Sequence, residues 1–184
     1  MESMNVFAAL PEIVLLIGAC GLLVIDLFVP DARRNVTYVL ALAVMVLTGA
    51  MCWAMLSAGL VTYAFNGMYV TDPMANVLKL FAIVTTGMTL IYAQSYARDR
   101  VLWKGEIFTL TLFALLGILL MISANNLLVI YLGLELQSLS LYTLVALRRD
   151  DARSSEAAMK YFVLGALASG FLLYGMSMLY GATG

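Results

Sequence analysis

Six long apolar stretches, separated by short polar segments, run through this chain. Each is long enough to cross a bilayer, because a helix rises about 1.5 Å per residue and the hydrocarbon core is about 30 Å thick. The pattern predicts an all-α, polytopic transmembrane helix bundle that forms a single membrane domain over residues 1–184. The predicted spans are residues 10–29, 36–57, 73–96, 107–123, 125–147 and 156–180.

Polar residues and prolines mark the expected starts of several spans. Side chains such as Asn, Asp and Ser cap helix amino termini, and proline suits the first turn. The expected starts are Pro11 with Glu12, Asn35, Asp72 with Pro73, and Ser154 or Ser155. Residues 58–71 contain glycines and tyrosines but no charge, so we expect an interfacial loop there.

The composition supports a membrane location and excludes several classes of function. Apolar residues make up 64% and charged residues 11%, against about 45–50% and 25% in soluble domains. The formal net charge of −1 provides no basic field for nucleic acid. Cys20 and Cys52 lie inside apolar spans without a Cys or His at metal-ligand spacing. We therefore expect neither a disulfide nor a metal site.

Basic residues in the loops predict the orientation of the chain. They lie between spans one and two, three and four, and five and six, and the other loops and the amino terminus have none. The positive-inside rule places the amino terminus outside the cytoplasm, and six spans return the carboxyl end to that side. The amino terminus lacks the basic region of a secretory signal peptide, so the first span should be retained.

Asp26 and Lys79 are ionisable residues close to the ends of predicted spans. An acid near a span end can reach the lipid headgroups, and a long lysine stem can snorkel to them. We favour these anchoring roles for Asp26 and Lys79 over roles in proton transfer.

Glu135 stands near the middle of the fifth span, where a charged side chain costs at least about 2.5 kcal/mol. Such residues usually face a bundle interior or a water path. On a helix, Tyr131, Ser138 and Tyr142 share the face of Glu135, so the four form a stripe of hydrogen-bonding groups. Water could follow this stripe, which predicts a proton pathway with Glu135 as its central acid.

Lys160 lies about one turn into the sixth span, on the cytoplasmic side of Glu135. At about 8 Å and an effective dielectric of about 20, two opposite charges attract by about 2 kcal/mol, or ~1.5 pKa units. This coupling is large enough to gate a proton. The alternative is a static ion pair that fixes helix packing, and we favour the relay.

The sixth span also carries small residues four positions apart. The two pairs are Gly165 with Ser169 and Ala166 with Gly170. Small residues at this spacing let a neighbouring transmembrane helix approach closely, so we expect this face to pack.

The stretch from residue 124 onward carries a family resemblance. Its specific segments are GLELxSLxLYxL and, about twenty residues later, SxEAAxKYFxLGAxASxFLLYG. Together they closely resemble the subunit N family of the bacterial proton-pumping NADH-quinone oxidoreductase, respiratory complex I. This is an antiporter-like family of the membrane arm. By that resemblance, Glu135 matches the essential glutamate of the family's fifth helix, and Lys160 matches the lysine of its sixth.

The resemblance implies that protons move through charged residues and water, driven by electron transfer from NADH to quinone in other subunits. We expect quinone, NADH, FMN and iron–sulfur clusters in those partners. No cofactor is expected in this chain, which has no cysteine quartet and no G-x-G-x-x-G loop. The expected surroundings are the lipid bilayer of the bacterial inner membrane, protons and the other membrane-arm subunits, with no nucleic acid.

Members of the resembled family have about fourteen helices, built from inverted repeats. We therefore expect this chain to be the amino-terminal portion of such a protein. Two other classes of function stay open. One is a cation/proton antiporter subunit of the related multisubunit family, and the other is a non-catalytic membrane scaffold.

Overall fold

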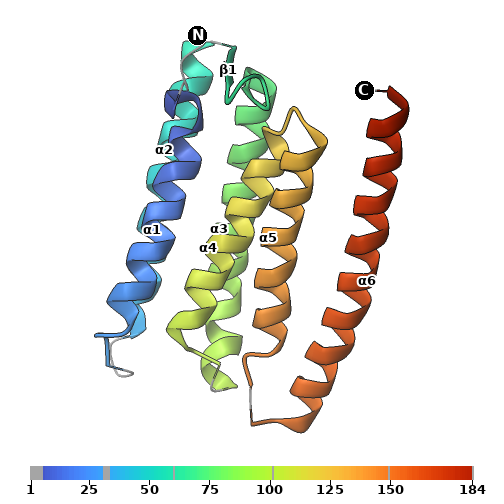
Figure 1. Cartoon of the computed structure of the whole chain (residues 1–184). Coiled ribbons are helices and arrows are strands. Elements are labelled where there is room, and N and C mark those ends of the chain that lie inside the picture. Colours follow the sequence, from blue (N-terminus) through green and yellow to red (C-terminus); the bar gives the residue numbers. More distant parts are fainter. Residues whose placement is uncertain (1–5, 31–33, 60, 101, 149, 184) are drawn as a thin grey trace.

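The helices stand side by side and alternate in direction (Figure 1). This computed structural model describes residues 6–30, 34–59, 61–100, 102–148 and 150–183, and within them six helices are long and apolar enough to span a membrane. They are α1 (Leu10–Asp26), α2 (Arg34–Ala58), α3 (Pro73–Asp99), α4 (Gly105–Ile122), α5 (Leu127–Val145) and α6 (Ala152–Thr183). The predicted class, span number and span order are confirmed.

Two of the predicted helix starts are wrong. Asn35 is not an N-cap, because α2 already includes Arg34. Ser154 and Ser155 lie inside α6, which begins at Ala152. Hydropathy marks the part of a helix that crosses hydrocarbon, and these helices continue into the polar region beyond it.

Other predicted ends agree with the structure. The Asp72 carboxylate caps α3 by accepting a 2.6 Å hydrogen bond from the Ala75 amide, and Pro73 occupies the first turn. Pro11 likewise lies in the first turn of α1, which follows a short 3-10 helix, η1 (Val6–Ala9).

The segment expected to be an interfacial loop instead forms a β-hairpin. Strands β1 (Thr62–Ala64) and β2 (Tyr69–Thr71) pair antiparallel. Phe65, Asn66 and Gly67 have φ angles of 51°, 56° and 82°, the left-handed backbone that tight hairpin turns require. Strands of three residues are too short to show a hydrophobic alternation, so the pattern did not reveal them.

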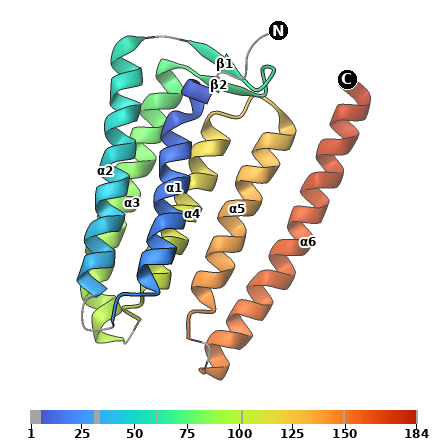
Figure 2. The ribbon, with the colours of Figure 1, turned by 60° about the vertical axis from the view of Figure 1, so that its left-hand side comes forward.

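The hairpin lies across the end of the bundle that holds η1 and the α4–α5 turn (Figure 2). Tyr69 forms an isolated bridge with Ala124, and the Thr71 hydroxyl donates a 2.9 Å hydrogen bond to the Ala8 carbonyl. The hairpin therefore connects α1, α3 and α4 at one end of the fold.

The apolar core lies between α1, α2, α3 and α4. Its largest members include Leu15, Leu22, Met45, Ile83, Phe108, Leu112, Leu115 and Leu119. α5 packs on α4 at very short range. A Cβ atom on Gly117 would lie 2.5 Å from the Gly133 carbonyl oxygen, so this contact depends on glycine. α6 lies beside α5 at the edge of the bundle, with most of its residues exposed (Figures 1 and 2).

Candidate functional site

Glu135 lies near the middle of α5 and faces α6. Its Oε1 atom accepts a hydrogen bond from the Ser169 hydroxyl of α6. The hydroxyl oxygens of Ser169 and Tyr131 are 3.1 Å apart, so both α5 side chains meet the same serine. Glu135 and Tyr131 are only partly buried, whereas Ser169 is buried. The spacing of one helical turn between Tyr131 and Glu135 places both groups at this contact.

Tyr142 continues the same face of α5 toward the other end of the helix. Its ring meets Tyr161 and Phe162 edge-on, with centroid distances of 4.8 and 5.6 Å. Its hydroxyl lies against Gly165, where a Cβ atom would collide with it. The predicted close approach of a helix to Gly165 and Ser169 is therefore confirmed.

Other predicted features of this face differ in outcome. Ser138 lies between Glu135 and Tyr142 in the sequence and is partly buried. Ala166 and Gly170 are exposed, and no atom of the described residues lies within 4 Å of a Cβ placed on Gly170. Within the described residues nothing packs on this second small-residue pair, because α6 turns that side away from α5, so its packing stays a prediction.

Lys160 does not contact Glu135 within the described part of the chain. Its ammonium forms a 2.5 Å ion pair with Glu156, one turn earlier on α6, and the two side chains are 69% and 64% exposed. Nine residues separate Lys160 from Ser169, which is about 13 Å along a helix axis. Tyr142 meets α6 at Gly165, between these two levels.

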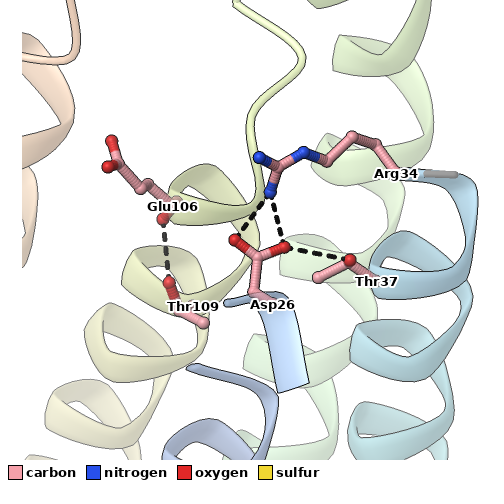
Figure 3. Close-up of polar contacts among 5 residues, drawn as sticks. All are labelled: Asp26, Arg34, Thr37, Glu106 and Thr109. Atoms are coloured by element: carbon pink, nitrogen blue, oxygen red, sulfur yellow. Dashed lines mark hydrogen bonds and ion pairs between the residues drawn. The ribbon is translucent and has the colours of Figure 1, made fainter. Parts of the chain in front are cut away.

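Asp26 has protein partners instead of lipid headgroups. Its two carboxylate oxygens each lie 2.7 Å from Nη1 of Arg34, and Thr37 donates a 3.1 Å hydrogen bond (Figure 3). The carboxylate also lies directly beside Gly105, the first residue of α4. A helix amino terminus and a guanidinium both stabilise a negative charge, which explains why the side chain turns inward and corrects the prediction of headgroup anchoring.

Lys79 does not snorkel, which is a second correction. Its side chain is fully buried, and its Nζ atom lies 2.7 Å from Glu12 Oε1 of α1 and 3.0 Å from the Tyr69 hydroxyl. Glu12 is 3% exposed. The attraction of a buried carboxylate in low dielectric outweighs the pull of water at the surface. Glu12 and Lys79 were thus missed as a pair.

A signal for this pair was present in the sequence. α1 and α3 begin at the same end of the bundle, and Glu12 and Lys79 both follow these starts within two turns. Opposite charges at similar depth in two parallel spans are candidates for pairing. The helix neighbours needed to apply that rule came only from the fold.

The chain is similar to known membrane proteins in both sequence and fold. Residues 124–184 match the family described as NADH:quinone oxidoreductase/Mrp antiporter, TM. This stretch contains α5 and α6.

Over nearly its whole length, the chain is similar to NADH-quinone oxidoreductase subunit N of several bacteria. It is 53% identical over 188 residues to the protein of Herminiimonas arsenicoxydans, covering 100% of this chain and 38% of that protein. The Laribacter hongkongensis protein is 57% identical over 182 residues, covering 98% and 37%. The chain is therefore a sequence relative of subunit N and spans somewhat more than a third of the length of these relatives.

Solved structures share the fold. A chain of "Respiratory complex I from Thermus thermophilus with bound Aureothin" aligns with a TM-score of 0.75 at 31% identity, covering 94% of this chain and 37% of that one. A chain of the membrane-bound sulfane sulfur reductase (MBS), an archaeal respiratory membrane complex, aligns with a TM-score of 0.78. Its identity is 23%, covering 96% and 37%, so this second likeness concerns the fold alone.

Proposed function

We propose that this chain is part of a proton-translocating membrane subunit of an NADH:quinone oxidoreductase in the bacterial inner membrane. The observation that supports this most is Glu135, an acid in the middle of a membrane-spanning helix that meets two hydroxyl groups at the α5–α6 contact. The same stretch matches the antiporter family, and the whole chain is similar to subunit N. The partners in this proposal are the other membrane-arm subunits.

Glu135 is the group that takes up and releases the proton. The Ser169 hydroxyl donates to its carboxylate, and Tyr131 meets the same serine. A hydroxyl can pass a proton on by accepting one at its oxygen and releasing its own. Tyr131 and Ser169 therefore extend the path from Glu135 toward the end of the bundle that holds the hairpin.

Lys160 and Tyr142 form the other half of the proposed path. Lys160 lies about 13 Å along α6 from Ser169, the residue that contacts Glu135, and two opposite charges at that separation attract by only about 1 kcal/mol at an effective dielectric of about 20. Proton movement between them needs intermediate groups. Tyr142 and Ser138 are positioned along the α5 face between the two charges, and water fills the remaining steps in this proposal.

We also propose how the chain is oriented in the membrane and what supplies the energy for proton translocation. The loops that carry basic residues lie at the end opposite the hairpin, so the amino terminus belongs on the non-cytoplasmic side. NADH, FMN, iron–sulfur clusters and quinone belong to partner subunits, where electron transfer drives the translocation.

The decisive experiment replaces Glu135 by Gln in the full-length subunit within the assembled complex. We expect loss of most NADH-driven proton uptake by inverted membrane vesicles with normal assembly, because glutamine cannot take up a proton. Asp150→Asn, an exposed acid in the α5–α6 loop, is the matched control and should pump normally. Normal pumping by Glu135→Gln would instead favour the scaffold function.

An antiporter subunit is the second candidate, because the matched family includes Mrp antiporters. The two candidates differ in their energy source. Proton movement that requires NADH and stops with a quinone-site inhibitor supports the oxidoreductase. Cation-driven proton exchange without NADH would support the antiporter.

A further inference from the structure

The pair formed by Glu12 and Lys79 lies outside the α5–α6 site and shares no residue with it. Lys79 and Glu12 are buried beneath the hairpin, joined by the 2.7 Å contact between Nζ and Oε1. Lys79 has three N–H groups, one of which donates to the Tyr69 hydroxyl, and neither carboxylate oxygen of Glu12 forms a hydrogen bond with a described residue. An ionised pair this deep is costly unless the surrounding polar groups complete its hydrogen bonds.

Asn76 and Ser123 are polar side chains near this pair that lack protein partners. Asn76 lies one turn before Lys79 on α3, and Ser123 follows the last residue of α4. Both are fully buried, and neither the Asn76 amide group nor the Ser123 hydroxyl forms a hydrogen bond with any described residue. An unpaired buried polar group costs about 1–3 kcal/mol, so groups of this kind normally bind internal water.

Tyr69 connects these groups to the ion pair. Its hydroxyl accepts a 3.0 Å hydrogen bond from Lys79. Burial, reinforced by the negative charge of Glu12, raises the pKa of Tyr69, with Ser123 and Thr71 opposing. Tyr69 therefore keeps its proton and remains a donor inside the cluster.

Four elements contribute side chains to this cluster. α1 supplies Glu12, β2 supplies Tyr69, and α3 supplies Asn76 and Lys79. The α4 end supplies Ser123, whose carbonyl also accepts a 2.9 Å hydrogen bond from the Val70 amide of β2. On α2, the buried thiol of Cys52 interacts electrostatically with both Lys79 and Glu12. No basic loop reaches this end of the bundle.

We propose that Glu12, Lys79 and Tyr69, together with Asn76 and Ser123, form a second intramembrane site that binds internal water and holds an exchangeable proton. Its position beneath the hairpin makes it a station at the end of the bundle opposite the basic loops. Its part in pumping depends on the proposed function, but the water site does not.

The chemistry of the site is a reversible protonation of Glu12. A hydronium delivered by the bound water transfers one proton to the Glu12 carboxylate, forming an O–H bond and leaving neutral water. Lys79 then carries the uncompensated positive charge, which drives the proton out again and restores the ion pair.

The first test is structural. Cryo-electron microscopy of the full assembled complex should show at least one ordered water bound to Asn76 or Ser123 beside Glu12. The inference is overturned if Asn76 and Ser123 instead bond directly to neighbouring protein groups and the cluster is dry.

The second test separates a proton site from a static clamp. The double variant Glu12→Gln, Lys79→Met removes both charges together, so it leaves no unpaired buried ion. We expect it to assemble and to translocate fewer protons per NADH oxidised. Normal stoichiometry in this variant overturns the inference.

A third variant keeps the test decisive if the double variant does not assemble. Asn76→Leu retains both charges but removes a water ligand, and we expect the same loss of stoichiometry. Normal stoichiometry here also overturns the inference. Thr48→Val is the matched control, because Thr48 is equally buried but bonds to the Val44 carbonyl of its own helix.

Glu135→Gln, measured in parallel, keeps the two proposals apart. If Glu135→Gln abolishes pumping and the Glu12, Lys79 and Asn76 variants pump normally, only the second site is wrong. If Glu135→Gln pumps normally, the proposed function itself fails.

Discussion

Glu12 and Glu135, each within a membrane-spanning helix, have opposite surroundings. Glu12 is buried beneath the hairpin, where its side chain from α1 meets the Lys79 ammonium from α3, which compensates its charge. Glu135 is partly exposed at the α5–α6 contact, and its described partners there are hydroxyl groups. Within the described residues, one acid is enclosed by a packed core, and the other lies at the contact of two helices.

This difference changes what a substitution at each glutamate disturbs. A compensated, enclosed charge holds helices together and is costly to disturb. A partly buried acid among hydroxyls can exchange protons with water without losing an ionic partner. Removing one charge of the Glu12–Lys79 pair should therefore act first on assembly, whereas changes at the α5–α6 contact should lower pumping without affecting assembly.

The largest expected effect comes from comparing the two lysines. Lys79→Met leaves Glu12 buried without its partner, which should destabilise the subunit by about 3–5 kcal/mol and strongly reduce its amount in the complex. Lys160→Met removes an exposed pair and should leave assembly nearly unchanged while lowering proton translocation. Blue-native gels and vesicle proton uptake measure the two effects. Equal assembly of both variants would contradict the comparison.

The next effect concerns the α4–α5 contact. Gly117→Ala places a methyl group 2.5 Å from a backbone oxygen, which cannot move aside as a side chain can. We expect overpacking of about 1–3 kcal/mol, visible as a lower melting temperature of the purified complex. Gly165→Ala is the comparison variant, since its obstacle is the end of the Tyr142 side chain, and it should be milder.

A smaller effect is expected from Ser169→Ala. This change removes the hydroxyl that meets both Glu135 and Tyr131. Since a hydrogen bond contributes about 1 kcal/mol net, we expect about a fivefold slower proton uptake with unchanged assembly. Ser177→Ala, whose hydroxyl bonds to the Tyr174 carbonyl of its own helix, is the control on α6. Unchanged uptake in Ser169→Ala would remove serine from the path.

The smallest effect belongs to Gly170→Ala. A Cβ atom there meets nothing within 4 Å among the described residues, and alanine favours a helix by about 1 kcal/mol over glycine. The melting temperature should stay the same or rise slightly. A clear loss of assembly would show that another segment or subunit packs on this side of α6.

Much of the fold was predictable because membrane crossing imposes a strong rule on sequence. A helix in hydrocarbon must satisfy its own backbone and present apolar side chains over about 20 residues, which makes the six spans visible. The hairpin was not visible, because three-residue strands have no readable period. The shared face of Tyr131, Glu135 and Tyr142 was also predictable, since it follows from helical spacing alone.

Contacts between helices far apart in the chain were not predictable in the same way. Asp26 and Lys79 were both expected at the lipid headgroups, and both turn inward to charged partners. Lys160 was expected to couple with Glu135 and pairs with Glu156 on its own helix. In each case the partner depends on which charged groups the fold brings within reach of the side chain.

The amino-acid sequence by itself determined the membrane class, the number and order of the helices and the helix face on which Glu135 stands. These properties depend on hydropathy and helical period, which act over neighbouring residues. Only the tertiary structure decided that Lys79 meets Glu12, that Ser169 meets Glu135 and that α6 lies at the edge. Those outcomes depend on distances between segments up to 67 residues apart, as for Glu12 and Lys79, which no local pattern encodes.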